Sequence, residues 1–317
     1  MVSTKSLNKT AILTGLTASG KTQIAIDFAH EHSNIEIINA DSILIYKGLD
    51  IGSAKPTLKE RKNIPHHLID IKNPDDLFTA GEFQTKVHQL LDQIHSQNKR
   101  ALIVGGTGFY IKSLLYPMWE VKTIPLDEKK SFQSQFDDVE PSLIYKELQS
   151  KDPVYALSIK PNDRYRILRG LEILHFFNKK PSTLKPKTHP KPNPLFSLLV
   201  IDRDKSELLS RIKLRTNLMI EQGFIEEVKN LASHYKDSKP LKSVGYKQIL
   251  DYLNQTPPKG RKPDFTLEGL KEEIILATKH LCKKQRTWFQ SEKSSNWFLL
   301  DNEKNKLLST LKEIYLK

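Results

Sequence analysis

Cysteine is almost missing from this sequence, since Cys282 is the only one among 317 residues. A single cysteine excludes an intramolecular disulfide and a zinc site built from several cysteines, which fits a reducing compartment. Long apolar runs are also missing, because no stretch approaches the ~18 residues that a membrane span requires. The first ten residues are mostly polar, and the sequence has no pattern that indicates a subunit interface. We therefore expect a cytoplasmic, monomeric protein without a membrane segment.

Acidic residues are in deficit relative to basic ones. The sequence has 37 Asp and Glu against 50 Lys and Arg, which gives a formal net charge of +13. Such an excess is unusual for an enzyme that acts on small anionic metabolites alone, and it favours a polyanionic partner such as nucleic acid. A merely basic surface is the alternative interpretation.

The pattern of apolar residues divides the chain into two kinds of segment. Residues 1–116 alternate short apolar runs ("AILTG", "IEIINA", "ALIVGG") with helical patterns, which is typical of an α/β fold with a parallel sheet flanked by helices. Isolated apolar residues among charged ones in residues 117–194 predict a mainly helical insertion domain. Its end, residues 178–195, is rich in proline and lysine and is expected to be extended. Residues 195–317 resume the core with a strand, "LFSLLVID", and a helical C-terminal part.

A long helical pattern covers residues 271–290. Four apolar residues fall on one stripe of this helix, which should pack on the core: Ile274, Ala277, Leu281 and Trp288. Four basic residues lie largely off the stripe and should face outward: Lys279, Lys283, Lys284 and Arg286.

The stretch "GLTASGKT" has the spacing G-x-x-x-x-G-K-[ST] of a phosphate-binding loop, directly after an apolar strand and before a helix. Its glycines let backbone N–H groups surround phosphate oxygens, Lys21 supplies a cation and Thr22 a metal-facing hydroxyl. The candidate phosphate ligands are Gly15, Leu16, Thr17, Ala18, Ser19, Gly20, Lys21 and Thr22. Kinases, nucleotide hydrolases and other transferases share this loop, so it leaves the reaction open.

Residues at the ends of the other strands should discriminate among these reactions, because ligands of such sheets bind at the carboxyl ends of the strands. Asp41 follows "IEIIN" and could hold a metal ion, accept a proton or cap the following turn. The strand "ALIVGG" is followed by Thr107 rather than by an acid, which is also compatible with an ordinary turn. Asp70 is another candidate metal ligand. His66 and His67 would point apart in a strand, so we interpret them as structural.

Several separate motifs together resemble one family. Most of the chain, from residue 11 to about residue 290, is similar in motif order to the bacterial type of the tRNA dimethylallyltransferase (isopentenyltransferase) family. The motifs are "GLTASGKT", "INADSILIYKGLDIGSAKP", "PHHLIDI", "TAGEF", "LIVGGTGFYIKSLL", "PNDRYRILRGLEIL", "RTNLMIEQGFIEEV", "KSVGYKQILDYL" and "ATKHLCKKQRTWF". The sequence departs from the family at Leu16, where proline is usual, and at Lys242 and Lys247, where arginine is frequent.

The resemblance implies a P-loop NTPase-like fold and a prenyl transfer. The loop would hold the diphosphate of dimethylallyl diphosphate, together with Mg²⁺ at Thr22. The acceptor would be N6 of the adenosine 3′-adjacent to the anticodon, in tRNAs that read codons beginning with U. Departure of diphosphate needs cations and N–H donors, and the weakly nucleophilic amine needs a carboxylate to accept its proton. By resemblance Asp41, Thr107 and Arg215 are catalytic. Arg211, one helical turn before Arg215, could lie on the same face, so it is the second candidate for the diphosphate contact.

The resemblance also implies which residues contact tRNA. They are Asp41, Ser42, Ile43, Leu44, Thr107, Tyr165, Arg166, Arg169, Lys242, Ser243, Val244, Gly245, Tyr246 and Lys247. Arg166 and Arg169 are three residues apart on a helix and would grip backbone phosphates as a pair. Tyr246 and Trp288 could stack on bases, although the apolar stripe favours a core position for Trp288. We expect the target base to leave its stack and enter a channel.

Three other functions are also compatible with the phosphate-binding loop. They are adenylate isopentenyltransferase, a P-loop nucleotide kinase, and an RNA-binding NTPase that would bind ATP. A kinase needs a lid that carries arginines, and a hydrolase needs a strand ending in a metal-binding acid. The sequence offers "GGTGFY" and, as a substitute acid, only Asp70, so it favours prenyl transfer.

Overall fold

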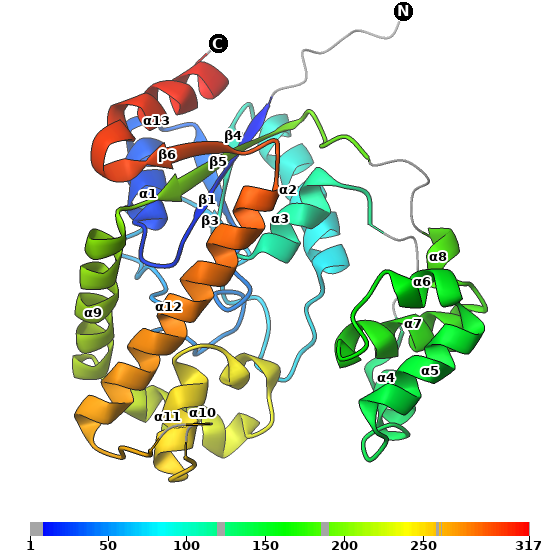
Figure 1. Cartoon of the computed structure of the whole chain (residues 1–317). Coiled ribbons are helices and arrows are strands. Elements are labelled where there is room, and N and C mark those ends of the chain that lie inside the picture. The colour runs from blue at the N-terminus through cyan, green and yellow to red at the C-terminus, as the bar shows by residue number, and fades with distance from the viewer. Residues whose placement is uncertain (1–8, 119–123, 185–189, 258–259, 261, 317) are drawn as a thin grey trace, which may run out of the picture. The chain divides into compact units, whose positions relative to one another are not determined.

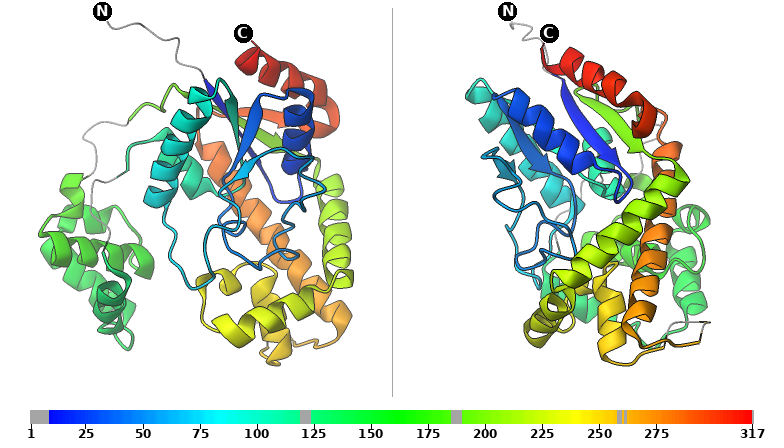
Figure 2. Two further views of the ribbon diagram at one scale, coloured as in Figure 1. Left: turned by 180° about the vertical axis from the view of Figure 1, so that it is seen from behind. Right: turned by 90° about the vertical axis from the view of Figure 1, so that its left-hand side faces the viewer.

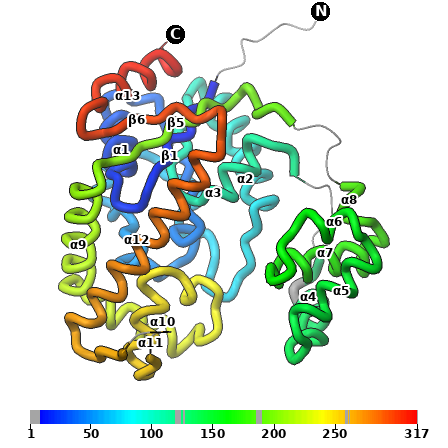
Figure 3. The backbone as a smooth tube through the Cα atoms, in the orientation of Figure 1, coloured from blue at the N-terminus to red at the C-terminus, as the bar shows by residue number. Residues whose placement is uncertain are grey.

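The computed structural model describes residues 9–118, 124–184, 190–257, 260 and 262–316. Contacts group the chain into two compact units, Met1–Leu115 with Pro192–Lys317, and Tyr116–Lys191. Figures 1 and 3 trace the chain through both units. Within the described residues, no helix is both long and apolar enough to cross a membrane.

The first unit is built on a sheet of parallel strands (Figure 2). In the described part of the chain the strand order is β3-β2-β4-β1-β5-β6. The strands are β1 (Thr10–Gly15), β2 (Ile35–Asn39), β3 (His66–His67), β4 (Arg100–Val104), β5 (Phe196–Asp202) and β6 (Asn296–Leu299). Leu13 is in register with Val104 on one side and with Leu199 on the other. This order brings the carboxyl ends of β1, β2 and β4 to one edge, where ligands of such folds bind.

Helices cover both faces of the sheet. Ala11 and Leu13 point into a core shared with α1 (Lys21–Glu31) and α13 (Leu300–Tyr315). Side chains alternate along a strand, so Ile12 faces the opposite side, where α2 (Ala80–Ser96), α3 (Gly108–Leu115) and α12 (Leu267–Ser291) contact the sheet or one another. The Tyr315 hydroxyl donates to Ala101 O at 2.7 Å and accepts from Ala11 N at 3.1 Å, which ties the last helix to two strands.

The remaining helices of this unit form a layer beside the carboxyl ends of the strands (Figure 1). They are α9 (Lys205–Glu221), α10 (Phe224–Tyr235), the 3-10 helix η1 (Lys239–Lys242) and α11 (Tyr246–Leu253). Both α9 and α11 pack against α12. The buried stripe of α12 consists of Gly269, Leu270, Ile274, Thr278, Cys282 and Phe289. The prediction of a core position for Trp288 was therefore wrong, because Phe289 is the fully buried aromatic residue and Trp288 is only half-buried.

The second unit is helical throughout its described regular structure. It contains α4 (Leu126–Ser134), α5 (Pro141–Lys151), α6 (Pro153–Leu157), α7 (Arg164–Phe177) and α8 (Pro181–Leu184). Its own core includes Ile144, Leu148 and Ile167. Helix α8 lies in the segment that we expected to be extended, and residues 185–189 of that segment lie outside the described residues. The predicted fold class, a parallel sheet flanked by helices with a mainly helical insertion, is confirmed.

Gly15, at the end of β1, is expected to tolerate no side chain. Its φ is +149°, and an added Cβ would lie 2.2 Å from the carbonyl oxygen of Ile201 on β5. Backbone strain and the contact together should cost about 3 kcal/mol in Gly15→Ala, measured as the free energy of unfolding in urea. Gly223→Ala is the matched control: its φ is +95° but the space around it is open, so strain alone should cost about 1 kcal/mol. Equal losses in the two variants would contradict the steric argument.

Candidate functional site

The phosphate loop joins β1 to α1, and its lysine folds back over it. Lys21 Nζ donates to Leu16 O at 3.3 Å. Burial lowers the pKa of Lys21, and the nearby negative charge of Asp41 opposes that shift. Leu16, which replaces the usual proline, is fully buried against Leu208 and Ile212 of α9. Packing of the Leu16 side chain therefore holds the loop in place, although leucine does not restrict the backbone as proline would.

Two arginines bind the loop from its outer side. Arg203 Nε donates to Ser19 O and Arg211 Nε donates to Ala18 O, both at 2.8 Å. A Cβ at Gly20 would lie 3.4 Å and 3.6 Å from the Nη2 atoms of the same two arginines. Both guanidinium groups therefore add positive charge beside the loop, and sequence analysis had not marked Arg203.

Asp41 lies directly after β2, at the predicted edge of the sheet. Its Oδ1 accepts a hydrogen bond from Ile43 N at 2.9 Å, and its own N–H donates to Asn39 Oδ1 at 2.9 Å. One oxygen thus caps the following turn, which is one of the roles considered for this residue. The other oxygen has no partner in the described contacts.

Thr107 joins the turn after β4 to the turn that carries Asp41. Its Oγ1 accepts from Ser42 N at 2.9 Å and donates to Ser42 Oγ at 3.2 Å. An added Cβ at Gly105 would lie 2.3 Å from Ala40 O, so only glycine permits this approach of the two backbones. Two predicted site residues that are distant in sequence are thereby fixed next to each other.

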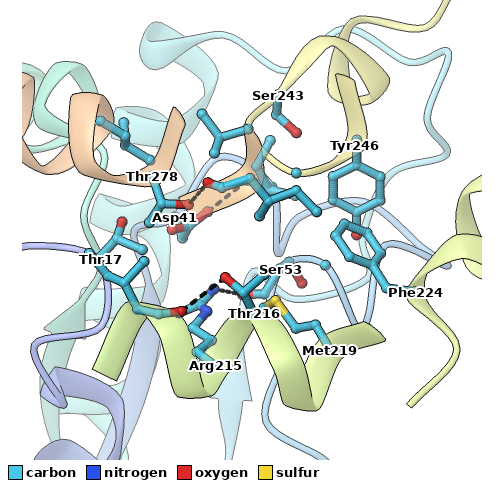
Figure 4. A pocket seen from close by; sticks show the side chains of 17 residues that line it. Thr17, Asp41, Ser53, Arg215, Thr216, Met219, Phe224, Ser243, Tyr246 and Thr278 are labelled. Carbon is cyan, nitrogen blue, oxygen red and sulfur yellow. Dashed lines mark hydrogen bonds between the residues drawn. The ribbon is translucent and has the colours of Figure 1, made fainter. Parts of the chain in front are cut away.

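A cavity opens beside these residues, between the loop after β2 and helices α9, α11 and α12 (Figure 4). Its polar residues include Thr17, Asp41 and Arg215. Its walls are mostly apolar and include Ile43, Ile212, Met219, Phe224, Val244, Ile274 and Leu281. A ligand with an anionic end and an apolar chain matches this combination of a cation beside the phosphate loop and hydrocarbon walls.

Arg215 is the cation of this cavity. It projects from α9, and its Nη2 donates to Ser53 O at 3.3 Å. Burial lowers the pKa of Arg215, while the Asp41 carboxylate opposes the shift. The structure thus separates the two candidate arginines, because Arg215 lines the cavity whereas Arg211 is bound to the outer side of the phosphate loop.

Two residues that sequence analysis missed hold the walls of this site. Gln285 of α12 accepts from Thr17 N at 2.9 Å through Oε1 and donates to Gly106 O at 3.1 Å through Nε2, joining two turns. Glu227 of α10 accepts from backbone N–H groups of the loop at residues 50–52. Both contacts link residues far apart in the chain, so no local spacing marked them.

The residues expected to contact tRNA differ in how exposed their side chains are and in the partners that they already have within the protein. Arg166 has a side chain that is 61% exposed and pairs with Asp163 at 3.3 Å, and Tyr165 is also exposed. Arg169 instead binds Glu172 at 2.8 Å, and the Glu172 side chain is 1% exposed. Arg169 thus binds a buried carboxylate and Arg166 a partly exposed one, and the grip of both on a phosphate stays a prediction.

The second expected tRNA segment follows η1. Ser243, Val244 and Gly245 line the cavity. Tyr246 also lines the cavity; it is 1% exposed and its hydroxyl donates to Glu227 at 2.8 Å, so its ring could meet only a base that enters the cavity. Lys242 and Lys247 are exposed, and Lys247 pairs with Asp251 on the same helix. Leu44, from the earlier segment, lies in a small separate cavity with Thr22 and His66.

The remaining candidates are structural. Asp70 binds the buried ammonium group of Lys55, so it is not a free metal ligand. His67 Nε2 lies 2.7 Å from Glu36 Oε2, and His66 Nδ1 lies 2.8 Å from Ile64 O, while the buried His66 Nε2 has no partner among the described residues. Among the described residues, no group of three or more His, Cys, Asp or Glu side chains is arranged to hold a metal ion.

With this geometry in place, comparison with known proteins assigns the family. A family model described as IPP transferase matches residues 44–292. The chain belongs to the IPP transferase family. The resemblance seen in the sequence motifs is thereby confirmed. The part matched by the IPP transferase model contains Thr107, Arg215, Glu227 and Gln285.

Individual IPP transferases match over a longer part of the chain. A protein named tRNA dimethylallyltransferase from Thermoanaerobacter sp. (strain X514) is 36% identical over 303 residues, which are 93% of this chain and 92% of that protein. A protein of the same name from Thermotoga neapolitana is 35% identical over 313 residues, 98% of each chain.

Solved structures of IPP transferases have the same fold. The tRNA isopentenylpyrophosphate transferase of Bacillus halodurans superimposes with a TM-score of 0.68 and 28% identity, covering 96% of this chain and 95% of that one. A eukaryotic dimethylallyltransferase acting on tRNA gives a TM-score of 0.77 over 93% of this chain and 75% of that one. At 24% identity the second match supports the fold alone.

Proposed function

We propose that the protein transfers the dimethylallyl group from dimethylallyl diphosphate to tRNA and releases diphosphate. The acceptor is N6 of the adenosine 3′-adjacent to the anticodon, in tRNAs that read codons beginning with U. The observation that supports this function best is the cavity of Figure 4, where Asp41 and Arg215 lie beside the phosphate loop and face apolar walls. Relatives that share about a third of their residues with this chain carry the name tRNA dimethylallyltransferase.

The site residues have distinct roles in this displacement. The bond between the allylic carbon and the diphosphate oxygen breaks while N6 forms a bond to that carbon, so negative charge grows on the diphosphate. Lys21, Arg215 and the N–H groups at the start of α1 would stabilise that charge, whereas the N–H groups of Leu16, Thr17 and Ser19 already donate within the protein. Asp41 accepts the proton that N6 loses, and Thr107 holds the turn that carries Asp41.

Mg²⁺ fits the donor set of the site. Magnesium binds through few protein ligands together with water and substrate phosphate oxygens, which the phosphate loop and a bound diphosphate would supply. Thr22, at the first turn of α1, would supply a hydroxyl ligand. When bound, Mg²⁺ neutralises charge on the leaving diphosphate.

The charge and the exposed residues support tRNA as the acceptor. The net charge of +13 matches a polyanionic substrate. We propose phosphate contacts by Arg166 of the helical unit and by Lys242 and Lys247 of the core unit, since all three are exposed. The target adenosine would leave its stack and enter the cavity lined by Ser243, Val244 and Gly245. We propose that the protein acts as a monomer.

A direct assay separates the proposed function from its rivals. The protein is incubated with Mg²⁺ and radiolabelled dimethylallyl diphosphate, together with unmodified tRNA, with AMP, or with ATP in parallel reactions. Label should enter tRNA alone. Label in AMP but not in tRNA would identify an adenylate isopentenyltransferase, and ATP turnover without prenyl transfer would identify an NTPase or a kinase.

Arg166→Ala and Arg169→Ala should act in different ways. Arg166→Ala is expected to weaken tRNA binding and to reduce the slope of log K against log salt by about one, because one phosphate contact is lost. Arg169→Ala should leave that slope unchanged. It should instead lower the stability of the helical unit by about 1 kcal/mol, because the buried Glu172 carboxylate would lose one partner but keep Gln133 and Lys129. Filter binding at several salt concentrations and urea unfolding measure both effects, and equal slopes for Arg166→Ala and wild type would exclude that contact.

A further inference from the structure

The Glu227 carboxylate, on α10, is the acceptor for four hydrogen bonds. Its Oε2 accepts from Asp50 N at 3.0 Å and from Ile51 N at 2.6 Å. Its Oε1 accepts from Gly52 N at 3.1 Å and from the Tyr246 hydroxyl at 2.8 Å. Three consecutive backbone N–H groups thus converge on one side chain from a distant part of the chain. Hydrogen bonds to a charged acceptor are among the stronger ones in proteins.

Close packing surrounds this carboxylate. A Cβ at Gly52 would lie 2.0 Å from the Phe224 ring and 2.7 Å from the Tyr246 ring. Those two rings meet edge to face, with centroids 5.0 Å apart. Burial and the charge of Glu227 both raise the pKa of Tyr246, so its hydroxyl stays a donor at neutral pH. The loop at residues 50–52 is therefore held by hydrogen bonds and also pressed against two aromatic rings.

The loop held by Glu227 forms a wall of the catalytic cavity. Gly52 and Ser53 line that cavity, and Ser53 O accepts the hydrogen bond from Arg215 at 3.3 Å. The first residue of the loop, Asp50, also pairs with Lys55 at 2.6 Å. A continuous series of contacts therefore runs from the Glu227 carboxylate through the loop backbone to the guanidinium group beside the phosphate loop.

We propose that Glu227 is a positioning residue for prenyl transfer, which fixes the loop at residues 50–53 so that Arg215 and the cavity wall keep the geometry of the reaction. This inference rests on the proposed function. Glu227 does not line the cavity, so it acts through the loop and not on substrate. Small displacements of positioning groups lower the reaction rate more than they weaken substrate binding, because the reacting atoms must be aligned in the transition state.

Glu227→Gln tests this role. A carboxamide has only one acceptor oxygen. In the variant its NH₂ group would face the Gly52 N–H, and two donors cannot form a hydrogen bond with each other. We expect kcat to fall about tenfold, with the KM for tRNA within about twofold of wild type, because tRNA affinity comes mostly from backbone phosphate contacts elsewhere. Hydrogen exchange at residues 50–52 should become faster. Glu226→Gln is the matched control, because Glu226 is its exposed neighbour on α10 and pairs only with Lys229 among the described contacts.

Each outcome decides the inference. A kcat of Glu227→Gln within twofold of wild type, an unchanged exchange rate at residues 50–52, or an equal loss in Glu226→Gln would overturn it. If Glu227→Gln does not fold, Glu227→Asp keeps the charge on a shorter side chain that cannot reach all three N–H groups, and wild-type kcat with unchanged exchange at residues 50–52 in that variant would overturn the role. Failure of the proposed function is distinguishable, since wild-type protein would then transfer no prenyl group while the exchange difference would persist.

Discussion

Asp41→Asn is expected to reduce the single-turnover rate of prenyl transfer by about 10³-fold, because the amide cannot accept the proton of N6 and carries no charge. The fold of the turn should survive. Asparagine keeps the Oδ1 that accepts from Ile43 N, and the backbone bond to Asn39 is unaffected. Affinity for tRNA should therefore stay near that of wild type, since phosphate contacts elsewhere supply most of it.

The same substitution should not raise the KM for dimethylallyl diphosphate. The Asp41 charge opposes the effect of burial on the pKa of both Lys21 and Arg215, so it is the anion that these cations face in the free enzyme. Removing it leaves two cations available for the diphosphate. Asp75→Asn, at an exposed acid outside the cavity, is the control for loss of one negative charge. A rate for Asp41→Asn near that of wild type would remove Asp41 from catalysis.

The parts of the site that were predictable from sequence are those encoded by local spacing. The phosphate loop has a fixed spacing between a strand and a helix, and Asp41 and Thr107 follow the next two long strands. Parallel strands end at the same edge of a sheet, so residues after β1, β2 and β4 had to meet once the fold class was correct. The contact between Thr107 Oγ1 and Ser42 N is the outcome of that rule.

Residues that act through tertiary contacts were not predictable in this way. Glu227 binds N–H groups that are 175 to 177 residues away in the chain, and nothing in "FIEEVK" distinguishes it from Glu226. Helical spacing placed Arg166 and Arg169 on one side but did not show that the partner of Arg169 is a buried carboxylate. A signal for Arg169 was present, because Glu172 follows it at the spacing of a helical ion pair. For Trp288, the helical stripe was correct to within one residue, and the neighbouring Phe289 is the buried one.

Arg215→Ala is expected to lower kcat/KM for dimethylallyl diphosphate by about 10²- to 10³-fold, the loss typical of removing one charged donor to a developing anion. Arg215 lines the cavity and faces the same space as Asp41 (Figure 4). Arg215→Lys should recover only part of this loss, because an ammonium group keeps the charge but lacks the planar donors that bind Ser53 O and a phosphate oxygen together.

Arg211→Ala is the matched comparison, four residues earlier on the same helix. Arg211 donates to Ala18 O and its side chain is 40% exposed, so its removal should loosen the phosphate loop and lower kcat/KM by about tenfold or less. The two variants lose the same charge at different places. The ratio of their kcat/KM values therefore separates the effect of position from that of net charge. A larger loss for Arg211→Ala than for Arg215→Ala would mean that the diphosphate is bound from the outer side of the loop and not from the cavity.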